Sequence, residues 1–249
     1  AWRIFIEWLG GLSFLLVAAL LLPLFGIGGA SYVAVNLPHG EGESLVDRLS
    51  SAFRRLGQTY ASITLAFAIS LWISGLPFLD GLTLAMTALA TGGYTLQADG
   101  LEVFNNALAE ALIAAALIAG ALNFTLVRGA ARGHAQTLFQ DQETKTFAKT
   151  LIIATLLMVA LSFGGMFEGE HEMGAYLWNH VFLTISTLTT SGLTSAYTDP
   201  IGLAIVILLL SLCLIGGSVV SPTGGIKMLR FHLLSRYATK ELARLAHPH

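Results

Sequence analysis

Two short polar stretches in an otherwise apolar chain hold the residue types that bind cations through backbone oxygens. They are TGGYT at 91–95 and TTSGLTS at 189–195. Carbonyl oxygens turned towards one axis replace the hydration shell of a cation, and glycine permits the positive φ that turns successive carbonyls the same way. Taken singly, each stretch also fits a glycine-containing turn between two ordinary helices. We predict a cation filter whose oxygens come from Thr91, Gly92, Gly93, Thr190, Ser191 and Gly192.

The composition of the chain indicates the setting of these loops. Of its 249 residues, 55% are hydrophobic and 11% are charged, which is typical of an integral membrane protein. A net charge of −2 gives no indication of nucleic-acid binding. Because Cys213 is the single cysteine, the chain has neither an internal disulfide nor a zinc site of the CxxC type.

Five apolar ranges reach the roughly 20 residues that a helix needs to cross a bilayer core. Two further apolar ranges, 80–90 and 175–189, cover about half a bilayer at about 1.5 Å per residue, and each leads into one of the polar stretches. The predicted fold class is therefore all-α integral membrane, with five membrane helices, the fifth broken, and two half-helices. The five longer ranges are 4–29, 58–76, 104–127, 147–166 and 201–234, the last with an interruption.

The distribution of charge places both half-helices on the same side of the membrane. Most Lys and Arg residues lie between the first two spans, between the third and fourth, and after the fifth, whereas 77–103 and 167–200 contain acidic residues and no Lys or Arg. The positive-inside rule assigns the basic segments to the cytoplasm. Both half-helices then enter and leave at the outer side as re-entrant loops, beside Asp99 and Asp199, which would concentrate cations.

The polar stretches belong to an internal repeat. Thr91 and Gly93 recur as Thr190 and Gly192, 99 residues later. The repeating unit is a helix, a pore loop and a second helix, and the predicted organisation has six parts. These are the last helix of repeat 1 (1–37), a cytoplasmic linker (38–57), repeat 2 (58–130), a second cytoplasmic linker (131–146), repeat 3 (147–237) and a cytoplasmic tail (238–249).

The fifth span is interrupted by IGGSVVSPTGGIKMLR at 215–230. Proline removes a backbone donor and clashes with the preceding turn, and glycine loosens the helix further, so we predict a broken helix. Its position on the cytoplasmic side of the filter suits a movable gate, and a fixed kink packed against its neighbours is the alternative. A lysine at this depth is costly, so we expect Lys227 to cap loop carbonyls or to face the pore vestibule. The predicted gating residues are Gly216, Gly217, Ser218, Pro222, Thr223, Gly224, Gly225 and Lys227.

Several other polar residues suggest chemical hypotheses. EGEHE at 168–172 holds three carboxylates and a histidine, which suits a divalent metal, but an exposed outer loop fits the same residues. His180 with Ser186 or Ser191 suggests an intramembrane serine hydrolase, although a nucleophile requires a base within hydrogen-bond reach and a structural His180 is the simpler interpretation. Glu110, near the outer end of a span, either braces the adjacent pore loop or faces solvent.

With these residues assembled, the sequence resembles the TrkH/KtrB family of potassium transporters and, within it, the TrkH branch. The resemblance implies that the protein is not an enzyme. It implies instead a subunit of four helix–pore loop–helix repeats around one pore, with one filter glycine per loop, here Gly93 and Gly192. It implies K⁺ as the transported ion, held at Thr91, Gly92, Thr190 and Ser191, and no covalently bound cofactor. The matching stretches are WLGGLSFLLVAALLLPLFGIGG, ATGGYT, TTSGLTS, WNHVF, GGSVVSPTGGIKMLR and KELARLAHP.

The same resemblance implies where the protein acts and with what partners. It suggests a multi-pass protein of the bacterial inner membrane, in contact with membrane lipid, that forms a homodimer. A cytoplasmic ring of nucleotide-binding subunits of the TrkA kind would regulate opening. By this comparison the chain covers the end of repeat 1 and repeats 2 and 3. Symport with Na⁺ or H⁺ is left open, and an ion-coupled secondary transporter with broken helices is the alternative function.

Overall fold

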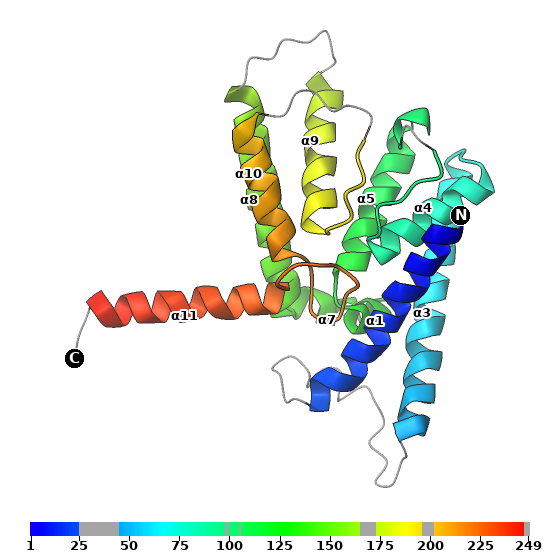
Figure 1. The fold of residues 1–249 in the computed structure, drawn as a ribbon, viewed down its shortest axis with the longest axis horizontal. Coiled ribbons are helices and arrows are strands. Elements are labelled where there is room, and N and C mark those ends of the chain that lie inside the picture. Colours follow the sequence, from blue (N-terminus) through cyan, green and yellow to red (C-terminus); the bar gives the residue numbers. More distant parts are fainter. Residues whose placement is uncertain (25–44, 98–99, 105, 165–172, 196–201, 247–249) are drawn as a thin grey trace.

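The computed structural model describes residues 1–24, 45–97, 100–104, 106–164, 173–195 and 202–246, and all regular secondary structure in these ranges is helical (Figure 1). The predicted all-α fold is therefore confirmed. The first helices are α1 (Trp2–Leu24), α3 (Leu45–Ile73), α4 (Phe78–Ala90), the short 3-10 helix η1 (Glu102–Phe104) and α5 (Ala107–Ala121). They are followed by α6 (Phe124–Ala131), α7 (Ala135–Gln140), α8 (Gln142–Gly164), α9 (Met173–Leu188), α10 (Leu203–Ile215) and α11 (Met228–Ala246).

Two helices in the described part of the chain are each long and apolar enough to cross a membrane, over Phe53–Ile73 of α3 and Gln142–Ser162 of α8. The pair α5 and α6 adds a third candidate if the two are counted as one span bent by 118°. α1 has 23 residues, of which only Arg3 and Glu7 are charged. At about 1.5 Å per residue it is about 34 Å long, comparable with a bilayer core of about 30 Å. The count of five membrane helices stays a prediction.

Helices form at both ranges predicted to be too short to cross. α4 has 13 residues and ends at Ala90, and α9 has 16 residues and ends at Leu188. Each helix therefore ends directly before one of the polar stretches. Pro77 stands at the N-cap of α4, where its missing N–H is not needed, and Asp80 in the first turn complements the helix dipole.

The third predicted span, 104–127, is not one continuous helix. α5 ends at Ala121 and the chain turns into α6. Asn123 caps α6 by accepting a hydrogen bond from the Thr125 N–H at 3.1 Å. The Ala121 carbonyl accepts instead from the N–H of Ser218, at 2.9 Å, in a segment nearly a hundred residues later. The range 104–127 is therefore two helices joined at a bend, where a distant segment supplies the hydrogen-bond partner that a continuing helix would have supplied.

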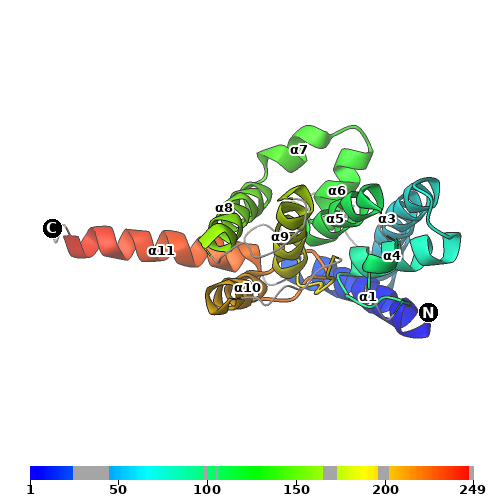
Figure 2. The same ribbon diagram turned by 90° about the horizontal axis from the view of Figure 1, so that it is seen from above.

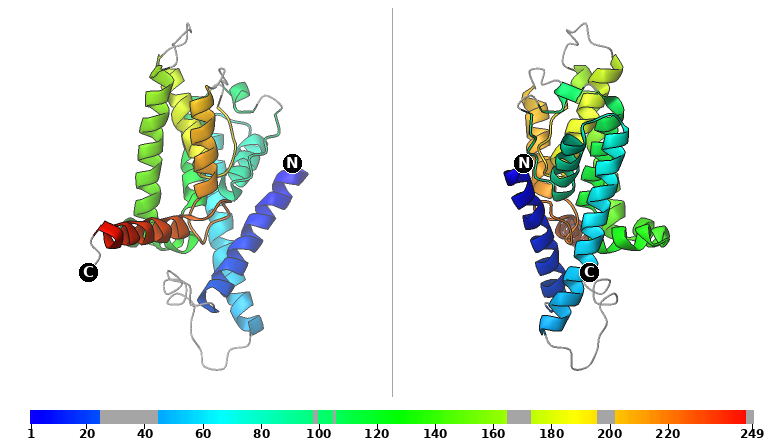
Figure 3. Two further views of the ribbon diagram at one scale, coloured as in Figure 1. Left: turned by 60° about the vertical axis from the view of Figure 1, so that its left-hand side comes forward. Right: turned by 90° about the vertical axis from the view of Figure 1, so that its right-hand side faces the viewer.

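The helices are arranged so that α5 lies between the two half-helices, α4 and α9, and contacts both. α8, α9 and α10 run side by side, and α9 lies next to α5 (Figure 1, Figure 2). α4 packs against α1, α3 and α5. α11 runs across the direction of α8 and α10 and projects away from the other helices (Figure 3).

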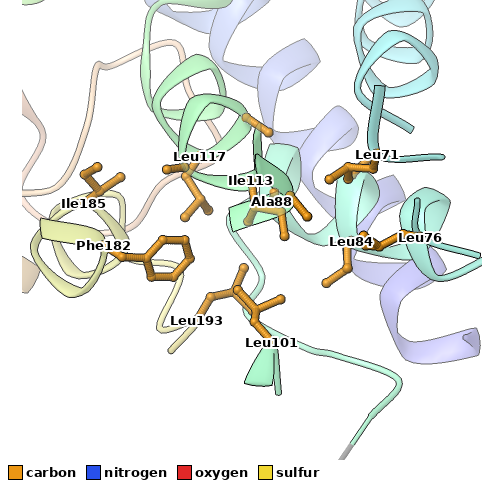
Figure 4. Packing of buried hydrophobic residues seen from close by; sticks show 14 of the residues in the cluster. Leu71, Leu76, Leu84, Ala88, Leu101, Ile113, Leu117, Phe182, Ile185 and Leu193 are labelled. Atoms are coloured by element: carbon orange, nitrogen blue, oxygen red, sulfur yellow. The ribbon is translucent and has the colours of Figure 1, made fainter. Parts of the chain in front are cut away.

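The main apolar core joins α4, α5 and α9. Figure 4 shows Ile113 and Leu117 of α5 between Phe182 and Ile185 of α9 on one side and Ala88 of α4 on the other. All five side chains are buried. Because lipid tails are as apolar as this core, the core stabilises the fold mainly through close packing of side chains rather than through removal of apolar surface from water. The packing fixes the ends of α4 and α9, and hence the two polar loops, relative to each other.

Candidate cation-binding site

The two polar loops share positive φ values at two matched positions. Thr91 and Thr190 lie in the left-handed region, with φ of 53° and 58°, and Gly93 and Gly192 have φ of 83° and 76°. A β-branched residue in that region is a genuine outlier, which persists only where the surrounding structure imposes it. Its occurrence at matched positions of both loops supports a shared role for them.

The same hydrogen bonds end both short helices. The Gly92 N–H donates to the Thr87 carbonyl and the Ser191 N–H donates to the Ser186 carbonyl, each at 2.9 Å. Donor and acceptor in the second loop each follow their counterparts by 99 residues, the spacing predicted for the repeat. These bonds turn the chain back on itself after each helix, so the last helical carbonyls and the loop carbonyls lie close together.

The two loops contact each other directly. A Cβ placed on Gly93 would overlap the Ser191 carbonyl oxygen, so only glycine fits there. A Cβ on Gly192 would meet nothing within 4 Å, so the requirement for glycine at that position comes from φ alone. A Cβ on Gly92 would meet the Glu7 carboxylate of α1. The contact places the Ser191 carbonyl of the second loop directly against Gly93 of the first.

A third segment, residues 216–227 between α10 and α11, reaches the second loop. The Gly224 N–H donates to the hydroxyl oxygen of Thr190 at 2.7 Å. Within the 216–227 segment the chain crosses itself so closely that a Cβ on Gly216 would overlap the Gly224 carbonyl, and Gly216 also has a φ of 72°. The interruption predicted in the fifth span is therefore a compact loop rather than a bend.

Backbone bonds across the break keep α10 and α11 joined. The Ile226 N–H donates to the Leu214 carbonyl at 2.8 Å, and the Met228 N–H donates to the Gly217 carbonyl at 2.8 Å. Val220, at the far side of the loop, is buried in an apolar cluster with residues of α1, α3, α4 and α6. The loop thus fills the space between the second polar stretch and those helices.

Lys227 lies in one of the two environments expected for it. Its ammonium group donates to the carbonyl oxygens of Ser221, at 3.0 Å, and of Thr223. It also lies 4.9 Å from the centroid of the Phe14 ring in α1, a cation–π arrangement. These contacts stabilise the charged ammonium group away from water, and they supply a donor to carbonyls that the broken helix leaves without partners.

Two acidic residues near the loops were missed by the sequence analysis. Glu7 lies beside Gly92, and its Oε2 atom is buried without a hydrogen-bond partner. Glu143, at the start of α8, accepts a hydrogen bond from the Ser218 hydroxyl of the 216–227 segment. An ionisable side chain within or at the edge of an apolar helix is the signal that marks both.

Glu110 braces the second short helix. Its carboxylate accepts a hydrogen bond from the indole N–H of Trp178 in α9 at 2.6 Å, and the residue is only 8% exposed. Of the two expected environments, solvent exposure is wrong. The bond links α5 to α9, and so helps to place the second loop.

Replacing Trp178 with phenylalanine should lower the thermal midpoint of unfolding in detergent, because the buried Glu110 carboxylate loses its donor. A hydrogen bond to a charged group contributes about 1.5–3 kcal/mol. Trp72→Phe is the matched control, since Trp72 is 56% exposed. Thermal unfolding followed by size-exclusion chromatography compares the two, and an equal fall in both midpoints would contradict the brace.

The remaining candidate residues do not form catalytic or metal sites within the described residues. The Nδ1–H of His180 donates to the Tyr176 carbonyl at 2.9 Å, whereas the hydroxyls of Ser186 and Ser191 are buried without hydrogen-bond partners. A serine nucleophile therefore has no base in reach there. In the same ranges no three His, Cys, Asp or Glu side chains gather as a metal site. The EGEHE stretch, Asp99 and Asp199 lie outside the described residues.

An all-helical fold with apolar helices and two matched polar loops defines the chain as a helical membrane protein with a candidate cation site. A family model described as TrkH, cation transport protein, matches residues 1–249, and the chain therefore belongs to the TrkH family. This is a family of transport proteins and not of enzymes.

Individual relatives agree with this assignment. The chain is 31% identical over 246 residues to the Trk system potassium uptake protein TrkG of Escherichia coli K12. This match covers 98% of this chain and 50% of that protein. The chain is 28% identical over 253 residues to TrkH of Vibrio parahaemolyticus, with coverage of 99% and 51%. The crystal structure of the potassium transporter TrkH from V. parahaemolyticus superposes with a TM-score of 0.85 over 99% of this chain and 50% of that one. The chain spans about half the length of these relatives.

Proposed function

We propose that the chain is part of the pore-forming subunit of a Trk-type potassium uptake system. The observation that carries the proposal is the contact between two loops that share positive φ at two matched positions and that follow the ends of two short helices. The names of the relatives, Trk system potassium uptake proteins, support K⁺ as the ion. In this proposal the carbonyls of Thr91, Gly92, Thr190 and Ser191 hold K⁺.

The chemistry of the site suits a weakly bound, dehydrated cation. Backbone carbonyls carry partial negative charge, so they replace water around K⁺ without the tight binding that a carboxylate ring would impose. The C-terminal ends of α4 and α9 add the negative end of each helix dipole. Gly93 and Gly192 permit the turn that aims these carbonyls, and each would be the filter glycine of its repeat.

The 216–227 segment is proposed as the gate of this pore. It bonds to Thr190 of the second loop on one side and inserts Val220 among the surrounding helices on the other, so it occupies space next to the proposed filter. Gly216 and Gly225 lie where the segment passes close to itself, and they permit its compact fold. In this proposal the segment opens while α10 and α11 stay joined at its ends. The gating residues are Gly216, Gly217, Ser218, Pro222, Thr223, Gly224, Gly225 and Lys227.

The predicted organisation completes the proposal. Residues 1–37 would close repeat 1, 58–130 and 147–237 would form repeats 2 and 3, and the cytoplasmic linkers and tail would lie between and after them. Two further loops would then complete the filter, in keeping with the share of its relatives that the chain covers. The chain would be multi-pass in the bacterial inner membrane among its lipids, as a homodimer, with a TrkA-type nucleotide-binding ring as regulatory partner.

Flux through the complete transport protein in liposomes tests the proposed function. We expect K⁺ to pass in preference to Na⁺ and to follow its own gradient, because a filter of carbonyls selects by ion size and field strength. Tracer uptake is measured with K⁺ or Na⁺ as the only cation, with and without a pH gradient. Uptake that depends strictly on a Na⁺ or H⁺ gradient would favour the coupled secondary transporter instead.

A further inference from the structure

Among the described residues, one acidic side chain of another helix forms a hydrogen bond with the 216–227 segment. That residue is Glu143, whose carboxylate accepts a hydrogen bond from the Ser218 hydroxyl. We propose that Glu143 is a positioning residue that latches the 216–227 segment in its closed conformation. The inference rests on the proposed gating role of this segment.

The latch is built on a buried side-chain donor. The Ser218 hydroxyl donates a hydrogen bond to the Glu143 carboxylate. Hydrogen bonds to an ionised acceptor are about twice as strong as neutral ones. Ser218 is buried, so no bulk water competes for the hydroxyl while the segment is closed.

Opposite charges act on the two halves of the segment. Glu143 accepts from the Ser218 hydroxyl, while Lys227 donates to the carbonyls of Ser221 and Thr223. A broken helix leaves C=O groups without partners, and the ammonium group of Lys227 binds two of them. The two charged groups also attract each other.

Opening would break the charged contacts that join the segment to other helices, from Glu143 to Ser218 and from Lys227 to the Phe14 ring, but not those within the segment. Lys227 belongs to the segment and can move with the carbonyls it binds. Glu143 belongs to α8, where Asp141 caps the helix by accepting from the Thr144 N–H at 2.9 Å. Its position is therefore set by α8 and by the linker before it, so opening the segment would separate Ser218 from Glu143.

Glu143→Gln in the complete transport protein tests the latch. Glutamine keeps the length of the side chain and an acceptor oxygen but removes the charge. We expect basal K⁺ flux in liposomes to rise about tenfold, the ratio that corresponds to about 1.4 kcal/mol. Ser218→Ala should also raise flux. In the double variant the two increases should not add in full, because both substitutions remove the same hydrogen bond. Glu241→Gln is the matched control, since Glu241 pairs with Arg244 on the surface of α11.

A direct readout of the segment separates a latch from a residue needed only for folding. In a Cys213→Ala background, Val220→Cys places a thiol at a buried position of the segment. Its rate of modification by a water-soluble thiol reagent should rise severalfold when Glu143→Gln is added. An unchanged rate, in protein that elutes as a single species, would overturn the latch.

The deletion of residues 218–223 distinguishes this inference from the proposed gate. If that deletion raises flux and Glu143→Gln adds nothing in the deleted background, the latch is supported, because its partner is gone. If the deletion raises flux but Glu143→Gln alone leaves flux at the wild-type level, the latch is wrong and the gate stands. If neither change alters flux, the gating proposal fails and the latch fails with it.

Discussion

Gly93→Ala should abolish selective K⁺ flux. Gly93 has a φ of 83°, and a Cβ at this position would overlap the Ser191 carbonyl of the other loop. The unfavourable backbone region alone costs an L-residue roughly 1–2 kcal/mol, and the overlap adds a displacement of one loop from the other. The loops then no longer present their carbonyls in a common geometry. The K⁺ to Na⁺ flux ratio in liposomes is the measurement.

Gly192→Ala is the matched comparison for this prediction. Gly192 occupies the equivalent position in the second loop, with a φ of 76°, but a Cβ there would meet nothing within 4 Å. We expect Gly192→Ala to reduce selectivity less than Gly93→Ala, because only the backbone penalty applies. Gly10→Ala in α1, which also has open space around it, should leave selectivity unchanged. Full selectivity in Gly93→Ala, or equal losses at both glycines, would contradict the assignment of the loop contact.

Deleting residues 218–223 should raise basal K⁺ flux severalfold to about tenfold. A tenfold rise corresponds to a closed state that is favoured over the open state by about 1.4 kcal/mol. The deletion joins Gly217 to Gly224, and these ends are already close, since the Gly217 N–H donates to the Thr223 hydroxyl at 3.1 Å. The bond from the Met228 N–H to the Gly217 carbonyl can therefore persist, so α10 and α11 keep their junction. Tracer flux per protein in liposomes is the measurement.

The deletion also removes the carbonyl partners of Lys227, and a buried ammonium without them would destabilise the fold. The same deletion with Lys227→Met controls for this effect, because methionine fills similar volume without charge. Flux at the wild-type level in both variants, with an unaltered thermal midpoint, would show a fixed kink rather than a gate.

Local features of the fold could be predicted because they depend on neighbouring residues. The short helices end where predicted, at Ala90 and Leu188, since apolar runs of limited length lead into threonine and glycine there. The interruption after Ile215 follows from its glycines and Pro222 in the same way. The extent of the third span could not be predicted, because the partner of the Ala121 carbonyl comes from Ser218.

By itself, the sequence determined the apolar character of the chain, the 99-residue repeat and the positions of both polar loops. Composition, spacing and turn chemistry are local properties that can be read without coordinates. Only the tertiary structure decided that Gly93 meets the Ser191 carbonyl, that Thr190 bonds to Gly224, and that Glu143 accepts from Ser218. Each of these contacts joins residues from different elements, and the packing of helices, rather than any periodicity along the chain, brings them together.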